Sequence, residues 1–373
     1  MVFFKNVFNF LKSLLIIILI TFLFSLLIDF FYGKKILIKL KPFLSKTQFS
    51  ESLVRIDHKI YHHTLRENVE YNKMPGFDGN HTFCTDNHGF KYKCKKNRDK
   101  KFNIGFLGDS FVEGLGLDYE KTFVGIFENE KNISVANLGS TSYATKIYLS
   151  KMKYLLDNNY FFDHIILFID ISDLYDDNVF YKLNNDYSVN ERNFNSKRLK
   201  RKKFLRNNFP LTNYYMYVIK MTSFKKKDDD LERNDKPFFY EKSLLKAKWT
   251  YSKKDIISGY LHPISKTQKE MIQNIEKLHN LLSEKNIKLS IVVYPWPQQL
   301  ENNDVNSKHV KMWKNFCENK CYKFIDLFPF FFKEIKKTSY LEVYKKYYFW
   351  NDVHFNYEGN KVIAKRLIEE FQK

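Results

Sequence analysis

Short apolar runs alternate with helical patterns along most of the chain after residue 101. The runs lie at 102–107, 133–138, 164–169, 289–295 and 323–328, and helical patterns occupy 113–130, the stretch up to 156, 265–285, 308–319 and 357 to the end. Apolar runs of this length are typical of buried strands. Strands alternating with helices predict a parallel sheet covered on both faces, a three-layer α/β/α sandwich. Functional groups in such sheets gather in loops at the carboxyl ends of the strands.

The N-terminus carries a separate apolar segment. Residues 13–32 read SLLIIILITFLFSLLIDFFY and contain one charge, Asp29, near the far end. The run is long enough to cross a bilayer as one helix, and no A-x-A-like cleavage site follows it, so residues 1–35 are expected to be an uncleaved membrane anchor. The flanking lysines, two before the run and four after it, favour a cytoplasmic body on the positive-inside rule; the cysteine pairs favour the other side.

Two further stretches differ from the alternating part, which we assign to a domain at 101–373. Residues 36–100 form a polar N-terminal extension, in which the stretch MPGFDGNHTFCTDNHGFKYKC predicts turns and a short hairpin. Residues of about 182–260 contain the runs KRLKRKK and KKKDDD and few apolar periods. We interpret them as an insertion or cap in the α/β domain.

The four cysteines form two local pairs, Cys84 with Cys94 and Cys317 with Cys321. Neither pair lies near clustered histidines, so a zinc site is weakly indicated and no metal is expected. Two short-loop disulfides in an oxidising compartment are favoured over free thiols in a core.

The formal net charge of +20 would suit an anionic partner such as nucleic acid, lipid headgroups or an acidic polysaccharide. Lys, Asn, Phe, Ile and Tyr are abundant together, as an AT-rich coding sequence would produce. No module with interleaved basic and aromatic readers is present, so no nucleic-acid partner is expected. We interpret the charge as mostly a solvated surface.

Two short polar motifs could together carry nucleophilic chemistry. Gly108-Asp109-Ser110-Phe111 follows the first predicted strand, and Asp352-Val353-His354 precedes the last helix. A serine just past a strand end and before a helix is well placed as a nucleophile. It needs a base and an orienting carboxylate, which His354 and Asp352 would supply. Taken singly, the first motif is more often a helix N-cap and the second a solvated surface.

The order and position of these motifs resemble the SGNH (GDSL-type) hydrolase superfamily. GFLGDSFVEG, VANLGSTSY and NDVHFNYEG are similar to three of its blocks, over about 102–181 and 262–373. The resemblance implies a flavodoxin-like sheet, catalytic roles for Ser110, Asp352 and His354, and an oxyanion hole made by the backbone N–H groups of Ser110 and Gly139. It implies no cofactor.

One block departs from the family pattern. Where the family carries G-x-N-D, this chain has Asp170-Ile171-Ser172-Asp173, and the shorter Ser172 side chain replaces an asparagine that would donate to the oxyanion. Asn137 is another nearby amide that could instead satisfy the loop backbone. Trp296 and Trp350 could stack on a sugar face or be buried against neighbours. The candidate substrate contacts are therefore Asp109, Asn137, Trp296 and Trp350.

The chain is similar in layout to the envelope polysaccharide O-acetyltransferases of this superfamily, which have an anchor, an extension and an insertion. The expected function is transfer or hydrolysis of an acyl group, acetyl above all, on a cell-envelope carbohydrate through an acyl-serine. A membrane-bound acyl-donor protein would be a partner, and the catalytic domain would lie outside the cytoplasmic (inner) membrane. The alternative is a catalytically weak binding or scaffold protein of envelope polysaccharide assembly.

Overall fold

The computed structural model describes residues 2–40, 54–192, 204–205, 208–216, 237, 239 and 241–372. These residues fall into two compact units. The smaller unit contains the N-terminal helix and the described residues between 204 and 216. The larger unit contains the sheet, the helices around it and the extension from Val54 onward.

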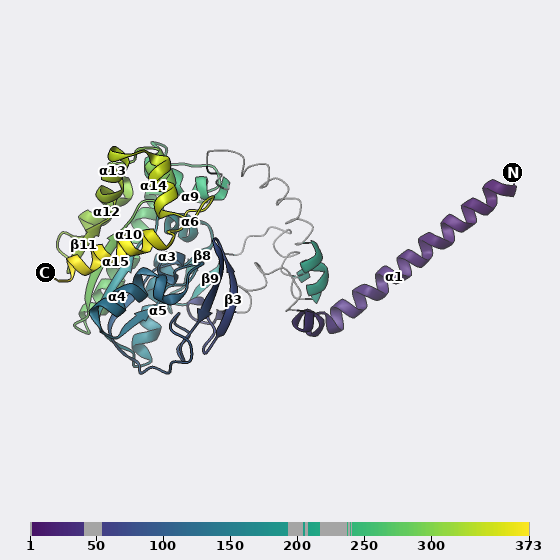
Figure 1. Ribbon diagram of the computed structural model, residues 1–373, viewed down its shortest axis with the longest axis horizontal. Coiled ribbons are helices and arrows are strands. Elements are labelled where there is room, and N and C mark those ends of the chain that lie inside the picture. The colour runs from purple at the N-terminus through teal and green to yellow at the C-terminus, as the bar shows by residue number, and fades with distance from the viewer. Residues whose placement is uncertain are drawn as a thin grey trace. The chain divides into compact units, whose positions relative to one another are not determined.

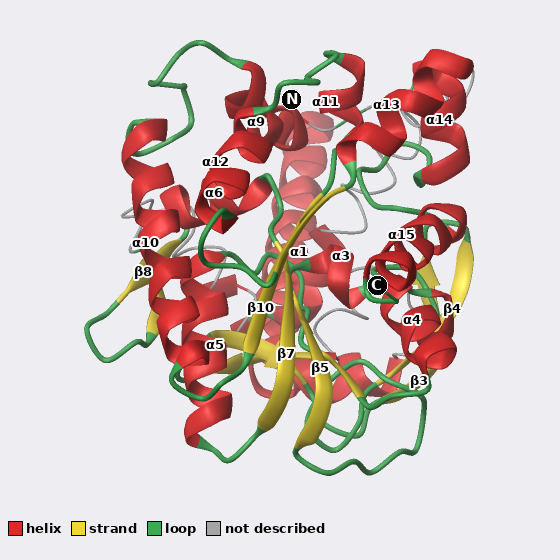
Figure 2. Cartoon of the chain, turned by 90° about the vertical axis from the view of Figure 1, so that its left-hand side faces the viewer, coloured by secondary structure: helices red, strands yellow, loops and turns green. Residues whose placement is uncertain are grey.

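A five-stranded parallel sheet forms the centre of the larger unit (Figure 2). Its strands are β5 (Lys101–Leu107), β6 (Val135–Asn137), β7 (Phe161–Phe168), β10 (Lys288–Val293) and β11 (Lys323–Asp326). Their order is β11-β10-β7-β5-β6, and every pair is parallel. Numbered along the chain, this is the 2-1-3-4-5 order of flavodoxin-like folds. The predicted fold class is confirmed.

Helices cover both faces of this sheet (Figure 2). On one side α4 (Phe123–Lys131) packs against α15 (Tyr357–Glu370), and on the other α5 (Thr145–Asp157) packs against α10 (Ile264–Ser283). Apolar side chains of the strands and of both helix layers form one buried cluster, so the sheet is buried on both faces. This unit also contains the helices α6 (Ser172–Val179), α9 (Glu241–Tyr251), α11 (Pro297–Glu301), α12 (Lys308–Cys317), α13 (Phe328–Lys337) and α14 (Tyr340–Tyr347).

The helix expected over 113–130 is wrong as a single element. The chain instead forms a one-turn helix α3 (Ser110–Glu113), a loop, the short 3-10 helix η2 (Tyr119–Lys121) and then α4. Gly114 and Gly116 lie in this loop with φ of 70° and 81°. Residues that carry a side chain rarely adopt such backbone angles, so the glycines end the helix soon after Ser110.

The extension folds into two antiparallel hairpins within the larger unit. They pair β1 (Arg55–His58) with β2 (His62–Leu65), and β3 (Glu70–Gly76) with β4 (Gly79–Cys84). The second is the expected short hairpin, and it turns at residues 77 and 78. Disulfides join Cys84 to Cys94 just after β4 and Cys317 to Cys321 at the end of α12.

The range 182–260, expected as an insertion, is divided between the two units. Strands β8 (Tyr181–Leu183) and β9 (Val189–Glu191) pair near the sheet, and α9 packs on the same unit. The indole of Trp249 in α9 is buried and donates to the Ile171 carbonyl at 2.8 Å. The basic runs at 197–203 and 225–230 lie outside the described residues.

The smaller unit is built on the helix α1 (Val2–Leu40), drawn in purple in Figure 1. Within it, Phe8–Gly33 is long and apolar enough to cross a membrane. Asp29 is nonetheless only 3% exposed. Its carboxylate accepts the backbone N–H groups of Leu211 and Thr212 at 2.9 and 2.8 Å. The acidic residue of the apolar run is thus paired within its own unit.

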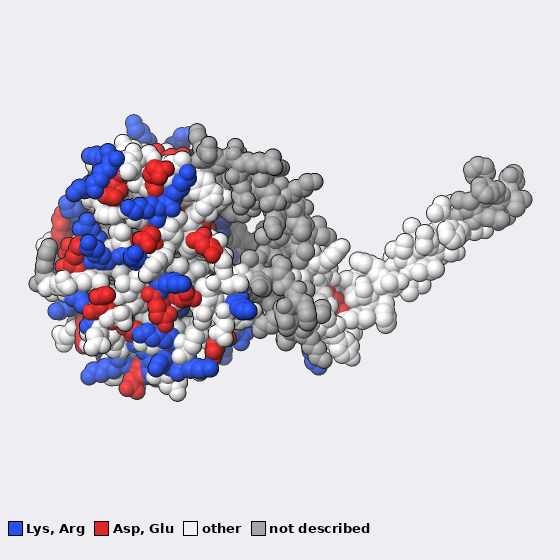
Figure 3. All heavy atoms as spheres, in the orientation of Figure 1, with Lys and Arg blue, Asp and Glu red and all other residues white. Residues whose placement is uncertain are grey.

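Charged side chains of both signs are interspersed on the face of the larger unit that Figure 3 shows. Helix α15 contains short-range pairs of opposite charge, Lys361 with Glu358 and Arg366 with Glu369. Exposed pairs of this kind contribute little to stability and are typical of a solvated surface.

Candidate active site

The candidate site lies at the carboxyl edge of the sheet, between β5 and β7. The chain leaves β5 through Gly108-Asp109-Ser110 and leaves β7 through Ile169-Asp170. In the 2-1-3-4-5 order these neighbouring strands connect to opposite sides of the sheet, so their loops diverge and leave a crevice. Ser110 begins α3 at this point, with Asp109 as the N-cap.

Ser110, His354 and Asp352 form one hydrogen-bonded chain. The Ser110 Oγ lies 2.8 Å from His354 Nε2, and His354 Nδ1 lies 2.5 Å from Asp352 Oδ1. The same carboxylate oxygen accepts the His354 backbone N–H at 2.9 Å. Each ring nitrogen of the histidine therefore has one partner, which is the geometry of a Ser-His-Asp triad.

The loop that carries Asp352 and His354 is braced from α14. The Tyr344 hydroxyl lies 2.8 and 3.0 Å from the carbonyl oxygens of Phe349 and Asp352, either of which can accept its proton. Asn351 turns the chain with φ of 60°, a conformation that asparagine tolerates better than most residues. The Phe111 ring packs against the His354 ring with centroids 4.7 Å apart. These contacts hold the imidazole on the serine side.

The surroundings of His354 favour its protonated form more than water does for a free histidine. Burial alone would lower the pKa of His354, but the adjacent Asp352 carboxylate outweighs it and raises the pKa above its ordinary value. Such a histidine is a stronger base for a serine proton.

Asp109 links the nucleophile to a buried carboxyl cluster. Its Oδ1 accepts the Phe111 N–H at 3.0 Å, and its Oδ2 lies 3.3 Å from Ser110 Oγ. Oxygens of Asp109, Asp170 and Asp173 lie within 4.8 Å of one another. Burial first, and then Asp170, raise the pKa of Asp109 to about 8. Burial also raises the pKa of Asp173 well above its ordinary value.

Within the described residues, these three aspartates are the group that could hold a metal ion. Their oxygens already have donors: Asp170 accepts Trp296 Nε1 at 2.6 Å and the Ser172 N–H at 2.7 Å, and Asp173 accepts the Tyr148 hydroxyl at 3.2 Å. The raised pKa values of Asp109 and Asp173 favour protonated carboxyls at these two positions over ligands of a cation.

The two expected oxyanion donors differ in their surroundings. The Ser110 N–H, at the start of α3, donates to no acceptor among the described residues. The Gly139 N–H donates to Asn137 Oδ1 at 3.1 Å, and Asn137 Nδ2 donates to the Val112 carbonyl at 2.8 Å. A Cβ on Gly139 would lie 2.4 Å from the Glu113 nitrogen, so only glycine lets this loop approach α3. Asn137 thus satisfies loop backbone.

Ser172 is buried at the first position of α6. Its backbone N–H donates to Asp170, and the described residues show no bond between its hydroxyl and Ser110 or His354. The side chains of this stretch that join the cluster with Asp109 are Asp170 and Asp173.

The two tryptophans lie in different surroundings. Trp296 is only 4% exposed, and its indole N–H is bonded to Asp170, which favours the buried alternative over sugar stacking. Trp350 is partly buried beside α14, with its ring 5.5 Å from that of Tyr344.

A buried ion pair that the sequence did not indicate supports the nucleophile from the extension. Arg55 in β1 donates to both carboxylate oxygens of Glu113 at 2.7 and 2.8 Å, and Glu113 also accepts the Thr141 N–H at 2.9 Å. Burial alone would raise the pKa of Glu113, but Arg55 outweighs it and holds the pKa below its ordinary value. The pair ties the end of α3 to the loop that carries Gly139.

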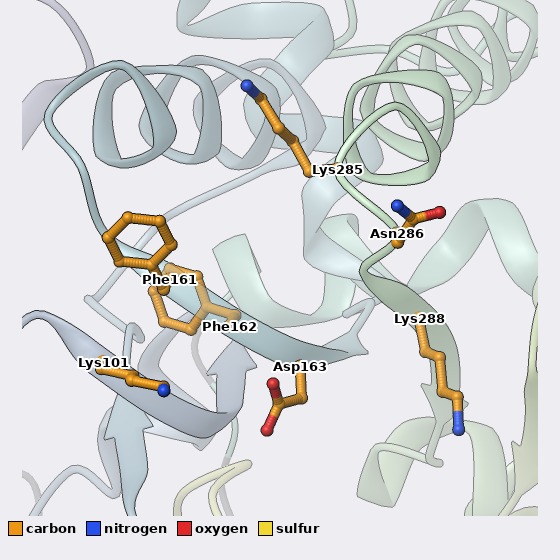
Figure 4. A pocket seen from close by; sticks show the side chains of 7 residues that line it. All are labelled: Lys101, Phe161, Phe162, Asp163, Lys285, Asn286 and Lys288. Carbon is orange, nitrogen blue, oxygen red and sulfur yellow. The ribbon is translucent and has the colours of Figure 1, made fainter.

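A shallow hollow lies at the other edge of the sheet, where the strands begin (Figure 4). Its lining residues come from the starts of β5, β7 and β10 and from the loop before β10: Lys101, Phe161, Phe162, Asp163, Lys285, Asn286 and Lys288. It contains no triad residue and is remote from the crevice along the strands.

No family model matches the chain, and no curated protein matches it. Among solved structures it is similar to a protein described as lipolytic and of the G-D-S-L family from Desulfitobacterium hafniense DCB-2, at 13% identity over 73% of this chain and 99% of that one, with a TM-score of 0.37. It is also similar to a member of the lipolytic G-D-S-L family from Veillonella parvula DSM 2008, at 13% identity over 73% and 98%, with a TM-score of 0.39. A third is a psychrotrophic esterase from Pseudoalteromonas sp. inhibited by monoethylphosphonate, at 12% identity over 74% and 97%, with a TM-score of 0.37. The function proposed below rests on the residues of this chain.

Proposed function

We propose that the chain is a membrane-anchored serine esterase or acyltransferase of the SGNH hydrolase type. The observation that carries this is the continuous hydrogen-bonded chain from Ser110 through His354 to Asp352. A protein that only kept the fold for binding would have no need to hold the serine oxygen 2.8 Å from the histidine nitrogen. This geometry favours a catalyst over a scaffold.

The chemistry follows from the geometry in two half-reactions. His354 Nε2 takes the Ser110 proton while Oγ attacks the ester carbonyl, and the negative oxygen is held by the N–H groups of Ser110 and Gly139. The tetrahedral intermediate collapses, and the C–O bond breaks as the leaving alcohol takes the proton from His354. Water or a second hydroxyl group then gives its proton to His354 and attacks the acyl-serine; the bond from the acyl carbon to Oγ breaks, and His354 returns the proton to Ser110. Asp352 keeps Nδ1 protonated and oriented throughout.

A sugar hydroxyl is the acceptor we place first, and acetyl is the acyl group. Ser172 stands where the family has an asparagine that donates to the oxyanion, and similar departures among the O-acetyltransferases of the superfamily support transfer over plain hydrolysis. A cell-envelope carbohydrate ester is then the substrate, and a membrane-bound protein would supply the acyl group. Transfer to a sugar and hydrolysis differ in their product, which is acetylated oligosaccharide in the first case and free acetate in the second.

Attachment to the cytoplasmic membrane, with the catalytic unit outside the cytoplasm, completes the proposal. The apolar helix Phe8–Gly33 supports a single span. Both cysteine pairs are joined as disulfides, which persist in oxidising compartments, and this supports the extracytoplasmic side.

The test uses the full chain, purified in detergent, with a chromogenic acetyl ester in the presence and absence of sugar oligomers. We expect turnover in the wild type and a loss of roughly 10⁴-fold or more in Ser110→Ala at unchanged melting temperature. Activity that survives this substitution would overturn the proposal. Acetylated oligosaccharide that forms only with the intact serine would select transfer over hydrolysis.

A further inference from the structure

The tip of the β3–β4 hairpin reaches the triad from the extension. The hairpin pairs Gly76 with Gly79 and turns through Phe77 and Asp78. Gly79 has φ of 118°, which a side chain would strain, so the turn places Phe77 at its tip. The ring of Phe77 stacks on Phe349 with centroids 4.5 Å apart and lies nearly parallel to the His354 ring at 5.9 Å.

The rest of the hairpin and the chain after it hold this position. The Thr82 N–H in β4 donates to Asp118 Oδ1 at 2.7 Å. The buried Lys91 ammonium donates to the carbonyls of Gly114 and Leu117 at 2.7 and 2.6 Å. A Cβ on Gly116 would lie 2.7 Å from the Phe77 ring, so the ring rests directly on backbone of this loop. The loop that follows the nucleophile helix and the hairpin are therefore fixed to each other.

Phe77 keeps part of its surface open although it is packed on several sides. It is 40% exposed, whereas Phe349 beneath it is 2% exposed. An isolated exposed aromatic ring needs no explanation. This ring, however, is anchored by a braced turn beside the catalytic histidine, and its free surface faces solvent next to the site.

The chemistry identifies which half of the ester would meet this surface. The acyl oxygen must lie toward the N–H groups of Ser110 and Gly139. The alcohol oxygen must lie toward His354 Nε2, which returns the proton to it. A ring packed against the face of His354 is therefore next to the alcohol half.

Resting on the function proposed above, we propose that Phe77, supported by Phe349, forms the alcohol subsite of the enzyme. The subsite takes an alcohol that presents a flat apolar ring face, namely a pyranose of the carbohydrate. The extension is then part of the active site and determines which alcohols are accepted. Aromatic rings suit such contacts because they offer area at little cost in side-chain entropy.

The test compares acetyl esters that differ only in the alcohol, an acetylated pyranoside oligomer and ethyl acetate, by acetate release from the full chain in detergent. We expect Phe77→Ala to lower kcat/KM on the acetylated sugar about tenfold and on ethyl acetate less than about twofold. Phe77→Trp should keep the activity on the sugar ester, whereas Phe77→Leu, which keeps apolar bulk without a ring, should not. Equal losses on both esters, or no loss on either, would overturn the subsite.

Phe161→Ala is the matched control. Phe161 is an exposed aromatic residue, 60% exposed, at the start of β7 and the other edge of the sheet (Figure 4). We expect this substitution to leave both rates unchanged. Melting temperatures of all variants report whether the hairpin has folded.

A binding measurement separates this inference from the proposed chemistry. Calorimetric titration of the unacetylated pyranoside oligomer into Ser110→Ala protein needs no turnover. Binding that weakens about tenfold when Phe77→Ala is added supports the subsite even if no ester is cleaved. Binding that is absent, or that is the same with and without Phe77, rejects the subsite and leaves the triad chemistry to be judged by its own test.

Discussion

The two edges of the central sheet carry similar residues in opposite surroundings. At the carboxyl edge, Asp109, Asp170 and Asp173 are buried and bonded to neighbouring donors. At the amino edge, Lys101, Asp163 and Lys288 are exposed around the hollow in Figure 4. Water screens the second set, whereas burial makes each charge of the first set depend on the position of its neighbours. Substitutions of the same kind should therefore have very different effects at the two edges.

The largest effect is expected for Asp352→Asn. The amide cannot hold the imidazole in the required tautomer or stabilise its charge, so kcat should fall by roughly 10²–10⁴-fold. The base must be unprotonated to act, and the pKa of His354 is raised above the ordinary histidine value of 6.5. Wild-type activity should therefore begin to fall on the acidic side at a pH above 6.5. Without the carboxylate, the remaining activity should persist to lower pH. A pH–rate profile measures both effects.

The exposed amino-edge residue Asp163 provides the control, since its carboxylate accepts the Asn103 amide at 3.0 Å and is remote from the triad. Asp163→Asn should leave rate and profile unchanged. An Asp352→Asn enzyme with wild-type kcat would remove Asp352 from the triad.

The next effect concerns stability. Glu113→Gln removes the buried negative charge that pairs with the partly buried Arg55 guanidinium, and breaking a buried pair on one side costs about 3–5 kcal/mol. At the amino edge, Asp157→Asn breaks the half-exposed pair with Lys153 in the last turn of α5 and should cost about 0.5 kcal/mol or less. Denaturant unfolding of the two variants gives the comparison. Equal costs would show that burial does not distinguish these pairs.

The smallest effect is on the alkaline side of the activity profile. Asp109 has a pKa raised to about 8, so it is neutral below that pH and ionises above it. The new charge is disfavoured by burial and by Asp170, and the Phe111 N–H, His354 and Lys246 partly offset this. Wild-type activity should fall severalfold as pH rises through this value. Asp109→Asn, which can still cap α3, should lack the fall. A fall that persists in the variant would assign it to another group.

The sheet could be predicted from the sequence because each strand has an apolar run that can be recognised without knowing its neighbours in space. A run such as Phe102–Leu107 followed by Gly108 needs no distant partner to be read, and the observed strands lie within a few residues of the expected ranges. The long aromatic stretch that forms α13 and α14 was not predicted, since its apolar residues pack with long-range neighbours such as Phe355. Its pattern alone does not distinguish strand from helix.

The residues of the site differ in the same way, between those found in local motifs and those defined by long-range contacts. Ser110, Asp352 and His354 were singled out from two short motifs, and the structure brings them together; their catalytic roles remain a proposal. Phe77 and Arg55 were not singled out, because their importance arises from contacts between the extension and α3 that no local spacing encodes. A phenylalanine in a turn, where polar residues are usual, was the one available signal.

The contact between Asn137 and the Gly139 N–H has a consequence for how binding energy would be used. A neutral ester carbonyl is a weaker acceptor than the amide oxygen that already occupies this donor at 3.1 Å, so a bound substrate would gain little there. An oxyanion is a much stronger acceptor and would displace it. On the proposed chemistry, the resting contact therefore withholds this donor from the ground-state carbonyl, which weakens substrate binding, and the contact must be broken as the oxyanion forms. Asn137→Ala should accordingly lower KM more than it raises kcat, and an unchanged KM would exclude this account.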